Sequence, residues 1–166
     1  ASAGVAWVAV PHLELSAATA GVSLTDLTLP ASHHILLGPM RFHYLDWGTA
    51  GRPPVVFLHG GGLNAHTWDL VCADLRPERH CLALDQRGHG ESEWSPEMDY
   101  STERHVGDLH AFLDALALRR CVLVGMSLGG ANALAWAGKH SARLAGLVLV
   151  DIGPETRADG TRKIAA

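Results

Sequence analysis

Val122-Leu-Val-Gly-Met-Ser-Leu-Gly-Gly130 is the stretch of sequence on which the fold depends. A short apolar strand runs into a G-x-S-x-G pattern and then into an alanine-rich helix. In this pattern the serine occupies a sharp strand-to-helix turn, whose strained backbone holds the Oγ atom clear of the sheet. Side chains two residues before and after the serine would collide, and Gly125 and Gly129 remove that collision. The helix N-terminus favours an anion beside the serine. The pattern therefore predicts that Ser127 is a nucleophile. The alternative is a glycine-rich turn in which the serine has no catalytic role.

Apolar strands alternate with helices on both sides of this stretch. The expected strands are 55–58, 80–84, the one before Ser127 and 144–150, and the expected helices are 65–75, about 101–118 and 128–140. Strands that are apolar throughout imply a parallel sheet covered on both faces, so the predicted fold class is α/β. In such sheets the chemistry gathers beyond the carboxyl ends of the strands, where His59, Asp85, Ser127 and Asp151 fall.

The sequence before residue 54 does not show this alternation of apolar strands and helices. Residues 1–23 show no sustained periodicity and are expected to be an extension, either disordered or packed on the outside. Ser23–Leu29 alternates as a half-buried strand would, and His34–Leu37 continues it or forms a separate strand. Met40–Asp46 alternates again after a Gly-Pro turn, so these segments predict an antiparallel hairpin leading into the sheet.

An acyl-transfer serine needs donors for the oxyanion that forms on its substrate. The backbone N–H of the next residue, Leu128, is one expected donor. The second should come from the loop after an earlier strand, where Gly60, Gly61 and Gly62 let the backbone approach a substrate closely. We favour the N–H of Gly61 as this donor, with His59 and Gly60 supporting the loop; the alternative is a plain tight turn.

Four motifs together resemble the α/β-hydrolase fold superfamily: His59-Gly-Gly-Gly62, Asp85-Gln-Arg-Gly-His-Gly-Glu-Ser92, Gly125-Met-Ser-Leu-Gly-Gly130 and Val150-Asp-Ile-Gly-Pro154. The resemblance runs from about Leu24 to Pro154. It implies an α/β-hydrolase-like, mostly parallel sheet and a serine hydrolase that acts on carboxylic esters or related acyl compounds. It also implies a small-molecule substrate and no cofactor. Residues 24–153 are then the core, truncated after about the sixth strand, and 154–166 begin a cap or lid segment.

The chain departs from this family at the general base. The family places that histidine after the last strand of its sheet, and the only histidine after Ser127 is His140. At ~1.5 Å per residue it lies roughly 20 Å from the serine along the helix, too far to act as a base. We therefore expect the base to be absent, and the alternative is a catalytically inactive fragment. Asp151 is a candidate acid of the triad or a residue that caps its turn. Asp85 is expected to be a turn residue that accepts backbone N–H bonds, and His59 and His89 are expected to hold loops in shape.

Composition excludes several other classes of function. The chain of 166 residues is 48% hydrophobic and 18% charged with a net charge of −4, which gives no reason to expect nucleic acid or an anionic membrane as a partner. The three cysteines are odd in number and lack C-x-x-C spacing, which favours reduced, buried thiols in a cytoplasmic protein. No stretch is apolar for long enough to span a bilayer. The histidines show no metal-ligand spacing, so no metal is expected.

Two further hypotheses concern binding. Gly60–Ala65 also satisfies G-x-G-x-x-A between a strand and a helix, and Asp85 ends the next strand, as in an NAD-binding Rossmann protein. That alternative leaves the turn at Ser127 unexplained. The strand 144–150 presents an apolar edge if no strand follows it, so we expect self-association through this edge.

Overall fold

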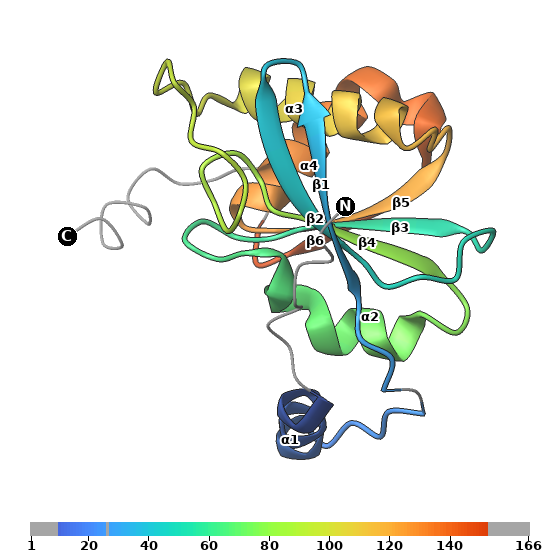
Figure 1. The fold of residues 1–166 in the computed structure, drawn as a ribbon. Helices are drawn as coiled ribbons and strands as arrows, with labels where there is room; N and C mark the ends of the chain where they lie inside the picture. Colours follow the sequence, from blue (N-terminus) through green and yellow to red (C-terminus); the bar gives the residue numbers. More distant parts are fainter. Residues whose placement is uncertain (1–9, 26, 153–166) are drawn as a thin grey trace.

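Strands and helices alternate along most of the chain in the computed structural model, which describes residues 10–25 and 27–152 (Figure 1). The strands are β1 (Ala31–Leu37), β2 (Met40–Asp46), β3 (Pro54–Leu58), β4 (His80–Leu84), β5 (Cys121–Met126) and β6 (Leu144–Val150). The α-helices are α1 (Val10–Ala20), α2 (Asp69–Leu75), α3 (Thr102–Ala115) and α4 (Leu128–His140). Two short 3-10 helices are η1 (Ala65–Trp68) and η2 (Ser141–Arg143).

The six strands form one sheet in the order β1-β2-β4-β3-β5-β6. β3 is parallel to both β4 and β5, and β5 is parallel to β6. β1 and β2 form an antiparallel hairpin, and β2 joins β4 antiparallel. The carboxyl ends of β3 to β6 therefore meet at one edge of the sheet, where the sequence places its candidate site.

Two hydrophobic clusters cover the two faces of this sheet. α3 and α4 lie on one face, where Phe112 and Trp136 are fully buried in a cluster with residues of β1 to β5. α1 and α2 lie on the other, where Trp47, Phe57 and Trp68 form the centre of the second cluster. The mostly parallel sheet with helices on both faces is the predicted fold class and is confirmed.

Most of the strands also begin and end where the sequence pattern predicts. β2, β4 and β6 have the predicted bounds, because each is a continuous or alternating apolar run that ends at a polar or turn residue. The predicted strand at Ser23–Leu29 is wrong: the described residues there form no strand. Its Leu24, Leu27 and Leu29 pack, partly buried, against the second cluster. A strand would turn Leu24 and Leu27 to opposite faces, whereas an irregular segment brings all three to the same cluster.

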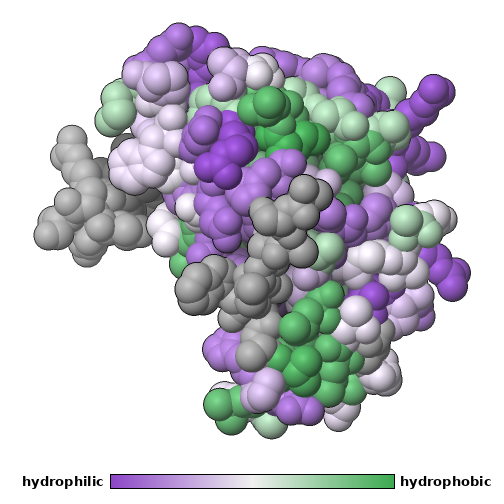
Figure 2. All heavy atoms as spheres, viewed as in Figure 1, coloured by the Kyte–Doolittle hydropathy of each residue, from purple (hydrophilic) through white to green (hydrophobic). Residues whose placement is uncertain are grey.

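Helix α1 is an element for which the sequence shows no periodic pattern. Leu13 and Ala17 are spaced by one helical turn and are 1% and 4% exposed, and α1 contacts α2 through this face. Pro11 stands at the start of the helix, where its missing N–H costs nothing. Figure 2 shows hydrophobic residues gathered around α1 in the lower part of the view. Leu15 of this helix is 67% exposed.

Two properties of the described residues bear on the environment of the protein. Cys72, Cys81 and Cys121 are all buried and free, as the sequence predicts. Within residues 10–25 and 27–152, no helix combines the length and the apolar character needed to cross a membrane.

β6 is an edge strand of the described sheet. β6 pairs with β5 only, and Val148 and Val150 on it are 47% and 37% exposed. We expect the 166-residue chain to self-associate through this edge in size-exclusion chromatography with light scattering, and lysines at both valines to weaken the association because a charged edge resists pairing. Val71→Lys is the control, since this valine of α2 is 42% exposed away from the edge. A wild-type chain that stays monomeric at every concentration contradicts the prediction.

Candidate active site

Ser127 lies at the turn between β5 and α4, in a backbone conformation that non-glycine residues rarely adopt. Its φ is 48° and its ψ is −111°, and the residue is exposed. Its N–H donates to the carbonyl of Val150 at the end of β6 (3.0 Å), and its carbonyl accepts the N–H of Ala131 (2.9 Å) in the first turn of α4. The neighbouring strand and the helix thus hold the strained residue from both sides, and the sharp turn expected from the sequence is present.

Three glycines make this turn sterically feasible. A Cβ atom on Gly125 would run into the backbone of Gly129, and one on Gly130 would meet both Ile152 and Gly125. A Cβ atom on Gly129 would overlap the carbonyl of Leu58 and lie 2.7 Å from the carbonyl oxygen of His59. Helix α4 therefore begins in direct backbone contact with the end of β3, which brings the serine beside the loop that follows β3.

The strain at Ser127 predicts an unusual response to substitution. We expect Ser127→Gly to be more stable than Ser127→Ala by about 1–2 kcal/mol, because glycine adopts a positive φ without steric cost. Urea denaturation of the two variants measures the difference. The matched control is Ser141, whose φ of −55° is helical; there the glycine variant should be the less stable one, by about 0.5–1 kcal/mol. The same order at both positions contradicts the prediction.

The glycine loop after β3 lies against the nucleophile turn. A Cβ atom on Gly60 would stand 3.6 Å from the Cβ of Ser127 and 3.3 Å from the Cε of Met126. Gly61 is exposed, with open space where its side chain would be. Leu128 is the first residue of α4, so its N–H has no acceptor within the helix. The structure therefore brings the two expected oxyanion donors, Gly61 and Leu128, to the region of Ser127.

His59 fixes the position of this loop. It is fully buried; its Nδ1 donates to the carbonyl of Gly60 (2.8 Å) and its Nε2 accepts the backbone N–H of Gln86 (3.0 Å). Burial lowers the pKa of His59, which keeps the ring neutral. Its carbonyl accepts the N–H of Gly129 (3.1 Å). Because both ring nitrogens are engaged, His59 holds the loop in shape and has no lone pair to offer the serine.

Two supporting residues are not predicted by the sequence. The side-chain amide of Gln86 donates to the carbonyl of His59 (2.7 Å), and the amide of Asn132 in α4 donates to Oε1 of Gln86 (2.8 Å). All three residues are buried. This network ties the glycine loop to the helix that carries the nucleophile. Gln86 belongs to a motif that the sequence singles out, whereas Asn132 carries no local signal.

Asp85 is a structural carboxylate at the end of β4. Its Oδ1 accepts the N–H of Ala65 (2.6 Å), and its Oδ2 accepts the N–H of Glu91 (2.9 Å) and Nδ1 of His43 (2.8 Å). It is 2% exposed. Both oxygens are therefore occupied, and the carboxylate is not available to the ribose of a dinucleotide. The NAD-binding alternative does not hold.

Asp151 and the histidines do not complete a triad within the described residues. Asp151 directly follows Val150, whose carbonyl binds the N–H of Ser127; it is exposed and has a φ of 54°. No hydrogen bond or ion pair among residues 10–25 and 27–152 involves its carboxylate or joins a histidine to the Ser127 hydroxyl. His140 is the last residue of α4 and stacks on His110 with a ring separation of 4.5 Å.

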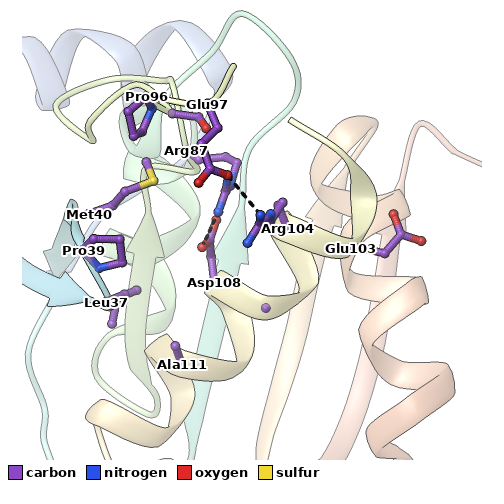
Figure 3. A pocket seen from close by; sticks show the side chains of 13 residues that line it. Leu37, Pro39, Met40, Arg87, Pro96, Glu97, Glu103, Arg104, Asp108 and Ala111 are labelled. Carbon is purple, nitrogen blue, oxygen red and sulfur yellow. Dashed lines mark hydrogen bonds and ion pairs between the residues drawn. The ribbon is translucent and has the colours of Figure 1, made fainter. Parts of the chain in front are cut away.

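A cavity of about 340 Å³ lies away from the serine, between the β1–β2 turn and α3 (Figure 3). Leu37, Pro39 and Met40 form one side of it. On the other side, Arg87 is held by both oxygens of Asp108 (2.6 and 2.7 Å). Ser127, Gly61 and Leu128 do not line this cavity, so it is not the site at the nucleophile turn.

Comparison with known proteins identifies the family to which this chain belongs. A model described as "alpha/beta hydrolase fold" matches residues 53–163, which is more than half of the chain. An esterase of Mycobacterium tuberculosis is 44% identical over 110 residues, covering 66% of this chain and 36% of the esterase. A haloalkane dehalogenase of Mesorhizobium japonicum is 35% identical over 124 residues, covering 75% of this chain and 40% of the dehalogenase.

A solved structure agrees with these matches. The crystal structure of an alpha/beta hydrolase from Novosphingobium aromaticivorans superimposes with a TM-score of 0.77 at 30% identity, covering 84% of this chain and 50% of that protein. The chain therefore spans 36–40% of the length of the two curated relatives and half of this structure. The relatives differ in the reactions that their names describe, and they share the hydrolase fold.

Proposed function

Because this chain belongs to the alpha/beta hydrolase fold family, we propose that it is a serine hydrolase that forms an acyl-enzyme on Ser127. Its substrates are carboxylic esters or related small acyl compounds. The observation that carries the proposal is the exposed, strained Ser127 between the first turn of α4 and the glycine loop after β3. The 44% identity to an esterase supports the acyl chemistry.

The proposed reaction begins with attack of the Ser127 Oγ on the carbonyl carbon of the substrate. The negative charge that develops on the carbonyl oxygen is stabilised by the N–H groups of Leu128 and Gly61. A general base takes the proton of the serine hydroxyl. The leaving alkoxide is protonated and departs as the alcohol. Asp151, beside the turn, is the candidate acid that would orient a histidine.

The general base is the part of the mechanism that the described residues do not supply. Without it, the 166-residue chain retains only the rate enhancement that the oxyanion donors and binding provide, far below that of a complete triad. We therefore propose slow acylation and little turnover for this chain by itself. The three free, buried thiols support a cytoplasmic location for the reaction.

A fluorophosphonate probe tests the nucleophile, because it phosphonylates activated serines. We expect the probe to modify Ser127 in the wild-type chain slowly, and Ser127→Ala to lose this modification completely, as mapped by peptide mass spectrometry. Ser141→Ala is the control, since Ser141 is exposed at the far end of α4 and should leave labelling unchanged. An unmodified Ser127 peptide contradicts the proposed nucleophile. Labelling as fast as that of a complete triad contradicts the missing base.

Substitutions at Gly61 test the second oxyanion donor. Gly61→Pro removes the N–H and should slow phosphonylation of Ser127 by about 10²–10³-fold. Gly61→Ala keeps the N–H and places its methyl group in open space, so labelling should stay close to the wild-type rate. Thermal unfolding of both variants shows whether the fold is retained. Equal labelling rates for the two variants would exclude Gly61 as a donor.

A further inference from the structure

A second serine, histidine and aspartate are joined by two short side-chain contacts that do not include Ser127. Ser32 of β1 has its Oγ 2.8 Å from Nε2 of His43 in β2. Nδ1 of His43 is in turn 2.8 Å from Oδ2 of Asp85 at the end of β4. The hairpin register pairs His43 with His34, so Ser32 and His43 are diagonal neighbours across two strands.

The surroundings of Asp85 determine which atoms carry the protons. Its two oxygens accept the backbone N–H groups of Ala65 and Glu91, which favours the ionised carboxylate. Burial acts to raise the pKa of Asp85, but the hydrogen bonds from His43, Glu91 and Ala65 together hold it below its usual value. An acceptor-only carboxylate requires that Nδ1 of His43 donates to it. In the neutral form of the ring, this tautomer leaves the Nε2 lone pair to accept the Ser32 hydroxyl.

We propose that Ser32, His43 and Asp85 form a second activated-serine site, which is acylated by small activated esters. A nucleophile hydrogen-bonded to a base that a third group orients is the arrangement that activates a serine. The side chains of His43 and Asp85 are 2% and 3% exposed, whereas Ser32 is only partly buried. The pair is thus shielded from water, whereas part of the Ser32 residue is exposed.

Two features lie beside the three residues. A cavity of about 290 Å³ is lined by the hydrogen-bond partner of Ser32, His43, together with Asn64, His66, Asp85, Gly90 and Glu91. Within the described sheet, β1 pairs with β2 only. Alternate N–H groups along such an edge strand point away from its partner, and one of them can donate to the carbonyl oxygen of the ester.

The acylation step balances without any further reactant. The Oγ of Ser32 bonds to the acyl carbon while its proton passes to Nε2 of His43, and Asp85 stabilises the resulting imidazolium. The bond from the acyl carbon to the leaving alkoxide breaks with its electron pair, and the alkoxide takes the proton from Nε2. The products are an ester on Ser32, the free alcohol and the original neutral imidazole.

The test uses the 166-residue Ser127→Ala variant, so its outcome does not depend on the proposed function. After exposure to p-nitrophenyl acetate, we expect an acetyl group on Ser32 by peptide mass spectrometry and a matching release of p-nitrophenol. Adding Ser32→Ala should remove this acetylation, and adding Ser141→Ala should leave it unchanged. An unmodified Ser32 overturns the proposal and shows that the three residues only hold β1 to the end of β4.

Substitution of His43 tests whether acetylation of Ser32 depends on the imidazole or only on the exposure of the serine. Adding His43→Gln keeps an acceptor near Ser32 without a base, and acetylation of Ser32 should slow by about 100-fold or more. If this variant does not fold, Ser32→Cys replaces it and is compared with Ser141→Cys. The imidazole should make the thiol at position 32 react at least about 10-fold faster with iodoacetamide at pH 7. Acetylation that does not need His43, or equal thiol reactivity, overturns the proposal.

Discussion

Replacing Gly129 with alanine is expected to lower the free energy of unfolding by about 3 kcal/mol or more, enough to unfold much of the chain. The added methyl group would overlap the carbonyl of Leu58 and crowd that of His59. Neither group can move away easily, because Leu58 pairs with Leu84 on one side and with Gly125 on the other. The start of α4 would have to shift instead, and with it the turn that carries Ser127.

Gly138 in the same helix provides the matched control for this prediction. A Cβ atom there meets nothing within 4 Å. Gly138→Ala should therefore stabilise the chain by about 0.5–1 kcal/mol, which is the helix preference for alanine over glycine. Urea denaturation of both variants measures the contrast. A Gly129→Ala variant as stable as the wild type contradicts the close contact between α4 and β3.

Replacing Asp85 with alanine is expected to cost about 3–5 kcal/mol, because it leaves three donors, two of them on buried residues, without an acceptor. These donors are the backbone N–H groups of Ala65 and Glu91 and the ring of His43. The first two anchor the start of η1 and the loop after β4, so losing their acceptor should loosen both. Asp74→Ala is the control, since Asp74 is an exposed aspartate of α2 and its removal should change stability by less than about 0.5 kcal/mol.

The stabilisation by Asp85 should also depend on pH in a defined direction. The pKa of this carboxyl is lower in the folded chain than its ordinary value, so the unfolded chain binds more protons at acidic pH. The difference in stability between the wild type and Asp85→Ala should be fully present above about pH 5 and shrink as the pH falls below about 4. Denaturation curves at pH 7, 5 and 3.5 measure this trend. A difference that grows at low pH contradicts the ionised, hydrogen-bonded carboxylate.

The central strands and the turn at Ser127 could be predicted because each depends on local sequence. A buried parallel strand is a short apolar run, as at His80–Leu84, and its end is marked by a polar or glycine residue. The turn needs glycine at fixed positions around the serine, and the contacts of Gly125 and Gly129 supply the steric reason.

The elements that were missed depend on contacts between distant residues. Helix α1 buries only two small or medium side chains, Leu13 and Ala17, so its apolar face is too narrow to produce a clear periodicity. The segment Ser23–Leu29 alternates like a strand, yet its leucines are held by a core cluster and not by a neighbouring strand. In both segments, tertiary packing and not the local sequence pattern determines the secondary structure.

The supporting residues of the site were beyond local sequence patterns for the same reason. Asn132 reaches Gln86 across 46 residues, and Gln86 reaches His59 across 27. Side-chain hydrogen bonds over such separations depend on how strands and helices assemble. That Asp85 accepts backbone N–H groups in its turn is a prediction of the sequence that the structure confirms, whereas its contact with His43 of β2 is not predicted.

The crystal structure of the chain after phosphonylation tests the central claim most directly, because it locates both the nucleophile and the oxyanion donors. We expect the phosphorus to be bonded to the Oγ of Ser127, with the phosphoryl oxygen about 3 Å from the backbone nitrogens of Leu128 and Gly61. A phosphoryl oxygen directed away from the glycine loop, or a phosphorus atom bonded to another residue, would contradict the account.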